Sequence, residues 1–437
     1  MTPALLPDNL SRTKTARQYG QAYGCAPALL LAELTQQLLG QKSSRPLLAI
    51  TNTVAEAEAL IRQLQYFLGN NNDAALLSDP ETLPYDRFSP HHDLISRRLE
   101  VLSRLAQGRI RILVVAGPTL FYRLPPADYI RAHGISLKQS ERITLEEFQT
   151  RLEDSGYQRM SQVNNHGEYA LRGSLIDVFP MGSEEPVRVD FFDDEIESLR
   201  LFDADTQLSL DAINAIHSLP AREFALHEEA IKKFRSRFRE RFEGNPSLCD
   251  VYRDVSEGRS PGGIENYLPL LHEATATLWD YLSTDTLIIN LGQIDSVLHS
   301  NWEQINQQYE QYRHDTERPA LTPEELFVSL ELQHQALSAR TVISLAVNEL
   351  PADGFNLAAK PAPALLINSH ADEPAEALAD WLESQTGRCL IAAESPGRRE
   401  MLADLLRHRG IRMPILSNWH EFISSNLPLA ITVAPLD

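Results

Sequence analysis

One serine of this chain lies in the pattern that surrounds nucleophilic serines, and the pattern fails on chemical grounds. Residues 258–262 read Gly-Arg-Ser-Pro-Gly and fit GxSxG. The residue after such a serine must donate its backbone N–H to the oxyanion, and Pro261 has no N–H. We therefore expect no serine nucleophile at this position.

The histidines and cysteines give no pattern of metal ligands. His91 and His92 are adjacent, but no carboxylate or cysteine follows at ligand spacing, and the chain has no HExxH. Cys25, Cys249 and Cys389 are far apart and form no CxxC. The sequence thus predicts neither a metal centre nor a disulfide framework.

Two segments lie where an ATPase would carry its nucleotide-binding residues, and both lack the necessary groups. A phosphate loop needs GxxxxGK[ST], whereas residues 20–28 read GQAYGCAPA, with no Lys, Ser or Thr and with Pro27 removing an amide. The apolar run at residues 286–289 continues into Asn-Leu-Gly-Gln instead of an acidic pair. Without carboxylates, magnesium and the attacking water have no organiser. We expect no nucleotide hydrolysis by this chain and no bound cofactor.

Length and composition place the chain among multidomain globular proteins. Its 437 residues suggest about three or four domains at roughly 150 residues each. A net charge of -20 repels phosphate backbones and favours protein partners over nucleic acid. The first 14 residues have no signal-peptide core, and no stretch approaches 18 apolar residues, so we expect a cytoplasmic protein without membrane contact.

The N-terminal third has the pattern of an α/β domain. Residues 47–51 form a short apolar run, and residues 53–68 carry apolar side chains at helical spacing. Thr53 and Glu56 fit a capping box, and Gly69 suits a left-handed helix end. Residues 109–116 then predict a buried parallel strand.

The next segment alternates with the period of strands, and helices return after it. Residues 136–220 contain short alternating runs broken by Gly and Pro, which predict an inserted, mostly β domain. Residues 228–242 predict a helix with an apolar stripe and six Lys and Arg residues. A solvated outer face is the commoner explanation of such a helix, and direct DNA binding through residues 232–241 is the alternative.

The C-terminal part predicts a linker and a small α/β domain. Residues 347–364 are rich in Pro and small side chains, which indicates a linker. Strands are expected at residues 364–368, 388–393 and 429–433, and helices at residues 374–383 and 396–408. Ser395 and Pro396 suit the start of the second helix. Because the sequence stops just after its last strand, we expect Asp437 to be a boundary within a longer natural chain.

Several segments resemble known DNA-repair proteins. Residues 169–180 (YALRGSLIDVFP), 187–196 (VRVDFFDDEI) and 263–267 (GIENY) resemble the excision-repair protein UvrB, the first two its second domain. Residues 83–93 (LPYDRFSPHHD), 166–169 (HGEY) and 191–195 (FFDDE) are similar to the N-terminal region of the transcription-repair coupling factor family, Mfd. These matches are in register across nearly the whole chain.

The resemblance to this family implies a fold and a division into domains. It implies a degenerate P-loop-ATPase-like (UvrB-like) α/β domain at residues 1–133 and 221–350, split by an inserted, mostly β UvrA-binding domain at residues 134–220. A small α/β domain at residues 351–437 follows. UvrB's aromatic β-hairpin for damaged DNA is not expected, because residues 79–93 are short and Pro-rich.

The resemblance also implies partners. It implies that UvrA binds the inserted domain, through Arg172, Arg188 and Phe192, with Arg159 as a looser match. RNA polymerase, double-stranded DNA, and the ATP and magnesium of a translocase motor belong to parts of the family's proteins that are not in this chain.

The residues themselves support an exposed aromatic beside arginine. In a strand at residues 187–192, Val187, Val189 and Phe191 face one way and the residues between them the other. If the first set is core, Phe192 is exposed next to Arg188, and such clusters are common in interface hot spots. Packing of Phe192 under a neighbouring loop is the alternative.

We therefore expect an adaptor that recruits UvrA to stalled transcription, without catalysis in this chain. The alternative is an ATP-dependent DNA-binding enzyme related to UvrB that uses an unusual site.

Overall fold

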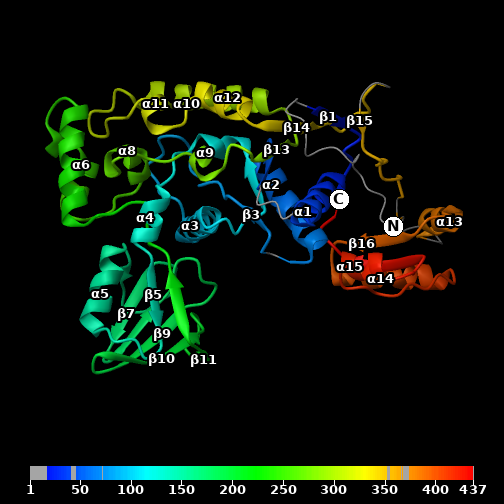
Figure 1. The fold of residues 1–437 in the computed structure, drawn as a ribbon, viewed down its shortest axis with the longest axis horizontal. Coiled ribbons are helices and arrows are strands. Elements are labelled where there is room, and N and C mark those ends of the chain that lie inside the picture. Colours follow the sequence, from blue (N-terminus) through cyan, green and yellow to red (C-terminus); the bar gives the residue numbers. More distant parts are fainter. Residues whose placement is uncertain are drawn as a thin grey trace.

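A computed structural model describes residues 17–40, 46–70, 72–351, 355–365, 367 and 374–436. A parallel sheet with helices on both faces forms the centre of the molecule (Figure 1). The inserted domain and the last domain project from one long side of this central domain, at opposite ends. Residues 1–14, in which we expected no signal peptide, lie outside the described residues.

The central sheet is built from chain segments on both sides of the insertion. Its strands in the described residues run parallel in the order β15-β1-β14-β13-β2-β4-β3. Their bounds are β1 Arg17–Gly20, β2 Leu47–Thr51, β3 Ala74–Leu76, β4 Ile112–Ala116, β13 Leu287–Asn290, β14 Thr341–Leu345 and β15 Phe355–Asn356. Because β13 pairs with β2, the segment after the insertion completes the sheet that the segment before it begins. The α/β class with an inserted β domain is confirmed.

Helices cover both faces because the strands are apolar on both sides. Leu47 and Ala49 of β2 pack with α1 (Ala26–Gly40) and α2 (Val54–Leu68), whereas Leu48 and Ile50 belong to the cluster with α3 (His92–Ala106) and α10 (Ile294–Tyr312). The expected caps of α2 are confirmed: Thr53 and Glu56 form both capping-box hydrogen bonds, and Gly69 has φ 70°.

The inserted domain is a second sheet with one helix packed on it. Its strands follow the order β11-β10-β9-β8-β7-β6, antiparallel except for β6 and β7. The elements are α5 Leu145–Asp154, β6 Gln158–Arg159, β7 Glu168–Arg172, β8 Leu175–Val178, β9 Val187–Phe192, β10 Glu195–Phe202 and β11 Ser209–Ile213. The chain enters this domain through β5 (Ile135–Lys138) and leaves through β12 (Ala215–Ser218), which pair antiparallel.

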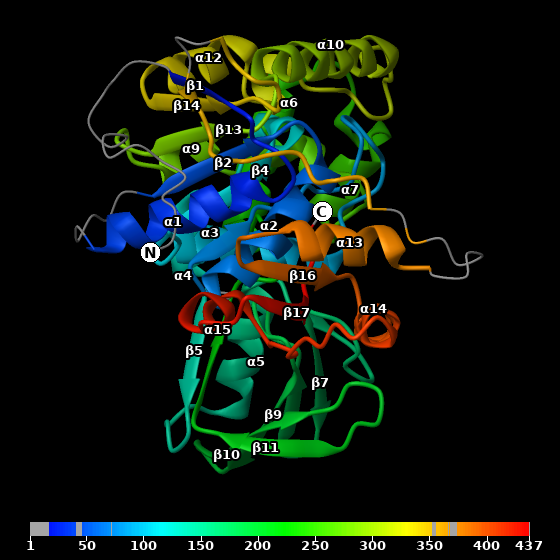
Figure 2. The same ribbon diagram turned by 90° about the vertical axis from the view of Figure 1, so that its right-hand side faces the viewer.

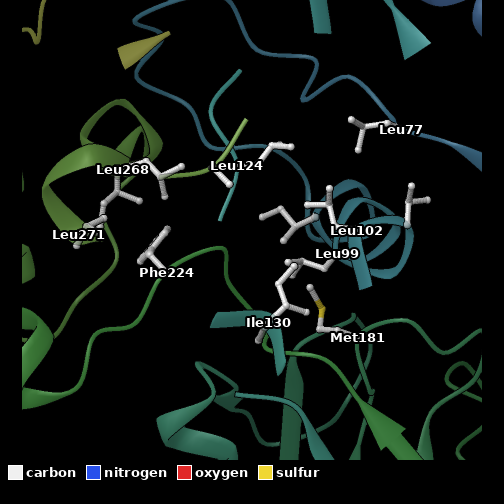
Figure 3. Packing of buried hydrophobic residues seen from close by; sticks show 14 of the residues in the cluster. Leu77, Leu99, Leu102, Leu124, Ile130, Met181, Phe224, Leu268 and Leu271 are labelled. Atoms are coloured by element: carbon white, nitrogen blue, oxygen red, sulfur yellow. The ribbon is translucent and has the colours of Figure 1, made fainter. Parts of the chain in front are cut away.

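The inserted domain shares its apolar core with the central domain. Figure 3 shows Met181 beside Ile130 and Leu99 at the junction, all buried. Polar contacts cross the same junction, with His166 Nδ1 2.7 Å from Asp93 Oδ1. Continuous apolar burial of this kind fixes the position of the insert on the central domain.

Short helices connect the strands of the central domain, and α6 (Glu228–Arg241) carries the basic residues that were noted in the sequence. Lys232, Lys233 and Arg241 form ion pairs with glutamates, and Arg237 donates to backbone carbonyl oxygens. These contacts favour the solvated face over a nucleic-acid surface. The remaining helices are η2 Gly117–Phe121, α4 Ala127–Ala132, η3 Pro246–Leu248, α7 Asp250–Ser256, η4 Ile264–Tyr267, α8 Leu268–Leu271, α9 Leu278–Tyr281, α11 Pro323–Leu326 and α12 Leu330–Ser338.

The last domain contains β16 (Cys389–Ala393) and β17 (Leu429–Val433), which pair in parallel, with α13 (Glu376–Ser384) and α14 (Pro396–His408). Figure 2 views the molecule from the side of this domain, with α13 and α14 in the foreground. Ser395 caps α14 as expected. An additional helix, α15 (Trp419–Ser424), packs on α2 through Trp419 and Phe67, whose rings are 5.4 Å apart.

The segment between the central and last domains differs in part from the expectation. The linker expected at residues 347–364 contributes β15, an edge strand on β1, because its Phe355 packs near Tyr19. The strand expected at residues 364–368 falls partly outside the described residues, and residues 364, 365 and 367 are not in a strand. Within the described part, no helix has the length and apolarity to cross a bilayer.

Candidate functional site

Strand β9 divides its side chains between the core and the surface as its alternation predicts. Val187, Val189 and Phe191 are buried against the central core, and the Phe192 side chain is 69% exposed. A single exposed phenylalanine is common on protein surfaces. Whether Phe192 belongs to a binding surface depends on its neighbours on the same face of the sheet.

A buried carboxylate organises the arginines of this face. Asp177 in β8 is 0% exposed, and Arg188 donates to it twice, from Nε to Oδ1 at 2.7 Å and from Nη2 to Oδ2 at 2.9 Å. These hydrogen bonds raise the pKa of Arg188. The Arg188 guanidinium also lies 5.0 Å from the centre of the Phe202 ring. Arg188 therefore holds Asp177 in the structure, because a buried carboxylate without a partner is costly.

Arg172 lies beside the same carboxylate but is more accessible. Its Nε is 3.8 Å from Asp177 Oδ2, and its Nη2 donates to Gln207 Oε1 at 3.2 Å. The exposed fraction of its side chain is 40%, against 17% for Arg188. The guanidinium makes this one hydrogen bond, to Gln207, among the described residues, so its other donors remain available to a partner.

Phe192 ends β9 at a tight hairpin that neighbouring backbone holds in place. Asp193, the next residue, has φ 54°, a left-handed conformation that Asp tolerates in turns. The Ile143 amide donates to Asp194 O at 2.9 Å. Phe192 is four residues along the strand from Arg188, about 13 Å at the usual rise of a strand. The hairpin and the arginines thus form one extended surface, which we call the Arg172–Phe192 surface (Arg172, Arg188 and Phe192).

Arg159 does not join this surface. It lies on edge strand β6 opposite Tyr169, and Tyr169 belongs to the buried core on the other face of the sheet. The Tyr169 hydroxyl donates to Glu153 Oε1 at 2.5 Å, and this bond, with the more distant charge of Arg159, lowers the pKa of Glu153. The structure therefore places Arg159 toward α5.

The carboxylates near this surface have other tasks. Glu168 accepts hydrogen bonds from the amides of Asn164 and Asn165. Partial burial would raise the pKa of Glu168, and these hydrogen bonds hold it below its ordinary value.

The role of Asp177 was not foreseen from the sequence. The available signal was a single acid inside an otherwise apolar strand, which needs a cationic partner.

In the loop at the expected nucleotide position, backbone amides donate hydrogen bonds to the protein's own carbonyl oxygens. It connects β1 to α1, and the Gln21 and Ala22 amides donate to Asn348 O at 3.1 Å and Ala346 O at 3.0 Å. A Cβ at Gly20 would overlap Asn356 Oδ1. Amides that would face phosphates in a phosphate loop face carbonyl oxygens instead.

The end of β13, where an acidic pair would lie, carries amides. Asn290 accepts from the Gly292 amide at 3.1 Å, and the Gln293 amide donates to Asn52 Oδ1 at 2.9 Å. His91 caps α3 by accepting from the Asp93 amide. Throughout the described residues, no group of three or more His, Cys, Asp or Glu side chains is placed to hold a metal ion.

Two family models match parts of the chain. The UvrB interaction domain matches residues 135–224, from the first residue of β5 to beyond the end of β12. The D3 domain of MFD matches residues 381–437, within the last domain.

Curated proteins are similar over most of the chain. The transcription-repair-coupling factor of Escherichia coli is 36% identical over 393 residues, which are 89% of this chain and 34% of that protein. The factor of Haemophilus influenzae is 36% identical over 92% of this chain and 35% of its own length. That of Bacillus subtilis is 28% identical over 62% of this chain and 24% of its own length. The chain spans about a third of the length of the first two relatives.

Proposed function

Because this chain corresponds to the N-terminal region of transcription-repair-coupling factors, we propose that it recruits UvrA, and so links stalled RNA polymerase to nucleotide excision repair. In this proposal the inserted domain binds UvrA, and the central domain holds the inserted domain in place. Contacts with RNA polymerase and double-stranded DNA, and the use of ATP and magnesium, belong to the rest of the longer protein.

One observation carries the proposed binding site: Phe192 is exposed on the strand whose arginine holds a buried carboxylate. A rigid aromatic side chain loses little conformational entropy on binding, which suits an interface anchor. Arg172 adds an accessible guanidinium that can pair with acidic or carbonyl groups of a partner. Arg188 supports both by fixing the sheet beneath them.

The test is the affinity of the purified chain for UvrA. We expect Phe192→Ala and Arg172→Ala each to cost about 2 kcal/mol, or roughly a thirtyfold higher Kd, because truncation of a central aromatic or arginine has that effect. Phe88→Ala and Arg131→Ala are matched controls, since Phe88 is 74% exposed and Arg131 is equally exposed in the central domain. Isothermal titration calorimetry measures each Kd.

Unchanged affinity in both surface variants would refute the site, and equal losses in the controls would show a non-specific effect. Arg188→Ala is unsuitable for this test, because loss of the partner of Asp177 is expected to destabilise the sheet itself.

We also propose that this chain does not bind or hydrolyse ATP. The support is the pairing of the Gln21 and Ala22 amides with backbone carbonyl oxygens, together with the lack of Lys, Ser and Thr in residues 20–28. Titration with a fluorescent ATP analogue in the presence of magnesium should show no saturable binding. Saturation at micromolar concentration would favour the alternative, an ATP-dependent DNA-binding enzyme.

A further inference from the structure

A cleft of about 220 Å³ opens where the central domain meets the segment that leaves the insert. It lies between the loop after β3, the start of α3, and residues 221–224. Its apolar lining includes Leu83, Pro84, Ile95, Phe224 and Phe327. Clefts that combine apolar walls with a few convergent polar groups are typical small-molecule sites.

Three arginines line the cleft or its walls, and two of them have partners. Arg98 donates from Nε to Glu223 Oε1 at 3.1 Å and from Nη1 to Ser78 O at 2.6 Å. Arg123 donates from Nη2 to Glu324 O at 2.8 Å. In contrast, the Arg222 guanidinium makes no hydrogen bond or ion pair with any residue that the structure describes.

The Arg222 side chain is partly buried and has no protein partner for its guanidinium among the described residues. Burial lowers the pKa of Arg222, and Tyr129 and Glu265, the latter of which also lines the cleft, oppose that shift. Glu265 is occupied by Ser89, whose hydroxyl donates to it at 2.7 Å. The arginines outnumber the two glutamates, so the cleft is locally positive in a chain of net charge -20. A local positive site in an acidic protein selects anions.

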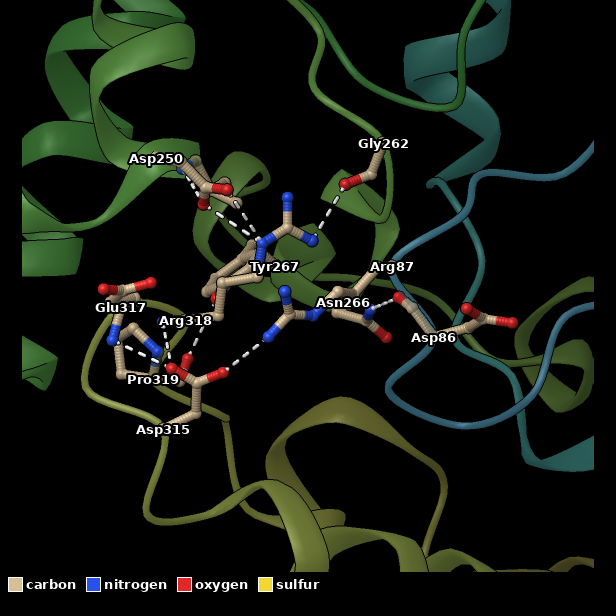
Figure 4. A network of polar contacts seen from close by, with 11 residues as sticks. Asp86, Arg87, Asp250, Gly262, Asn266, Tyr267, Asp315, Glu317, Arg318 and Pro319 are labelled. Carbon is tan, nitrogen blue, oxygen red and sulfur yellow. Dashed lines mark hydrogen bonds and ion pairs between the residues drawn. The ribbon is translucent and has the colours of Figure 1, made fainter.

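The walls of the cleft are held in place by contacts between distant segments. Figure 4 shows Asn266 Nδ2 donating to Asp86 O at 2.6 Å and Arg87 paired with Asp315 at 2.9 Å. The Gly263 amide donates to Ser89 Oγ at 3.1 Å. The loop after β3 is therefore fixed before any ligand arrives, which reduces the entropy cost of binding.

We propose that this cleft binds an organic anion with an aromatic body, with the anionic group on Arg222 and the ring against the apolar wall. A fork of guanidinium donors matches the oxygens of a sulfonate, phosphate or carboxylate. The cleft contains none of the residues of the Arg172–Phe192 surface, so a test of anion binding does not depend on whether the chain binds UvrA.

The test uses the whole chain and three probes: benzenesulfonate, inorganic sulfate and benzyl alcohol. Benzenesulfonate carries the same charge at every working pH, sulfate lacks the ring, and benzyl alcohol lacks the charge. Calorimetric or NMR titration should show saturable binding of benzenesulfonate and much weaker binding of the other two. Arg222→Gln should weaken benzenesulfonate at least tenfold, whereas Arg131→Gln, on an exposed arginine outside the cleft, should not change it.

A second variant keeps the test decisive if Arg222→Gln fails to fold. Ser260 lines the cleft from an exposed loop, so Ser260→Trp should obstruct the site without loss of core packing. The proposal is overturned if benzenesulfonate does not bind saturably, or if its binding is the same in the cleft variants as in the wild type. Equal affinity for sulfate and benzenesulfonate would overturn the ring pocket and leave an anion site only.

Discussion

Asp177 is the residue on which the Arg172–Phe192 surface depends. It is fully buried, and its two oxygens are occupied by the fork of Arg188, with Arg172 alongside. The attraction within a buried ion pair is largely offset by the free energy needed to remove both charges from water. Removal of one partner alone is much more destabilising, because it leaves the other charge buried and unpaired.

We expect Arg188→Ala to lower the free energy of unfolding by about 3 kcal/mol, because it leaves Asp177 buried without a partner. The double variant Arg188→Ala with Asp177→Ala should recover much of that loss. Urea denaturation of the two single variants and the double variant measures the coupling. Arg200→Ala, an exposed arginine paired with Arg188 in register on β10, is the control and should change stability little. Additive losses in the double variant would contradict the coupling.

Glu265 makes stability depend on pH. Burial raises the pKa of Glu265 to about 7, with Glu223 adding to the shift and the hydrogen bond from Ser89 opposing it. The unfolded value is about 4.3, so the folded state holds a proton that the unfolded state releases. The stability that this group contributes is therefore fully present below about pH 4.3 and is lost progressively as the pH rises to about 7.

Glu265→Gln should remove this dependence. We expect the variant to match the wild type near pH 4 and to exceed it at pH 8, by about 3 kcal/mol. Thermal unfolding at both pH values tests this. Glu303→Gln, on the exposed side of α10, should give no such difference between pH values, and an equal gain there would attribute the effect to net charge.

At the scale of elements, a pair of glycines lets two loops of the central domain approach each other closely. A Cβ at Gly262 would lie 2.7 Å from Arg87 O, and one at Gly263 would lie 2.7 Å from Asp86 O. Gly263 also has φ 73°. The GxSxG pattern at residues 258–262 thus contributes a close backbone contact, which explains its last glycine without a nucleophile.

Gly263→Ala should destabilise the protein more than the same change at an open site. Gly173 has φ 65° but nothing within 4 Å of an added Cβ, so Gly173→Ala carries only the backbone cost of about 1 kcal/mol. Gly263→Ala adds the clash with Asp86 O, and we expect a loss of about 2–3 kcal/mol. Urea denaturation compares the two variants, and equal losses would show that the loop moves freely to accommodate the methyl group.

Elements with their own local signals could be predicted from the sequence. The helix α2 has a capping box and a terminal glycine, and α14 begins at a serine followed by proline, so both were located. The strand β15 and the helix α15 were not. Each is short and forms against a distant element, β15 on β1 and α15 on α2, and local sequence cannot report such packing.

The same limit applies to the candidate sites. The exposure of Phe192 follows from period-two alternation, which needs only neighbouring residues. The position of Arg159 on the opposite face depends on the pairing of β6 with β7. The structural role of Asp177 depends on Arg188, which lies opposite it on the next strand. The cleft around Arg222 could not be predicted at all, since its walls come from segments more than a hundred residues apart.

At the scale of the whole molecule, three bodies are joined in different ways. The inserted domain shares a continuous apolar core with the central domain, whereas α15 of the last domain meets α2 through a few aromatic contacts such as Trp419 with Phe67. Larger continuous burial gives a more cooperative unit. The insert and the central domain should therefore unfold together.

The paired strands β5 and β12 have a mechanical consequence. Both covalent connections to the insert run side by side, with Ile135 opposite Ser218 and Lys138 opposite Ala215. A force applied to the insert by a bound partner is shared between two backbones that point along the same line. The cross-strand hydrogen bonds lie perpendicular to that line, so tension does not pull the two strands apart. The two connecting strands can therefore bear tension between the insert and the central domain without separating from each other.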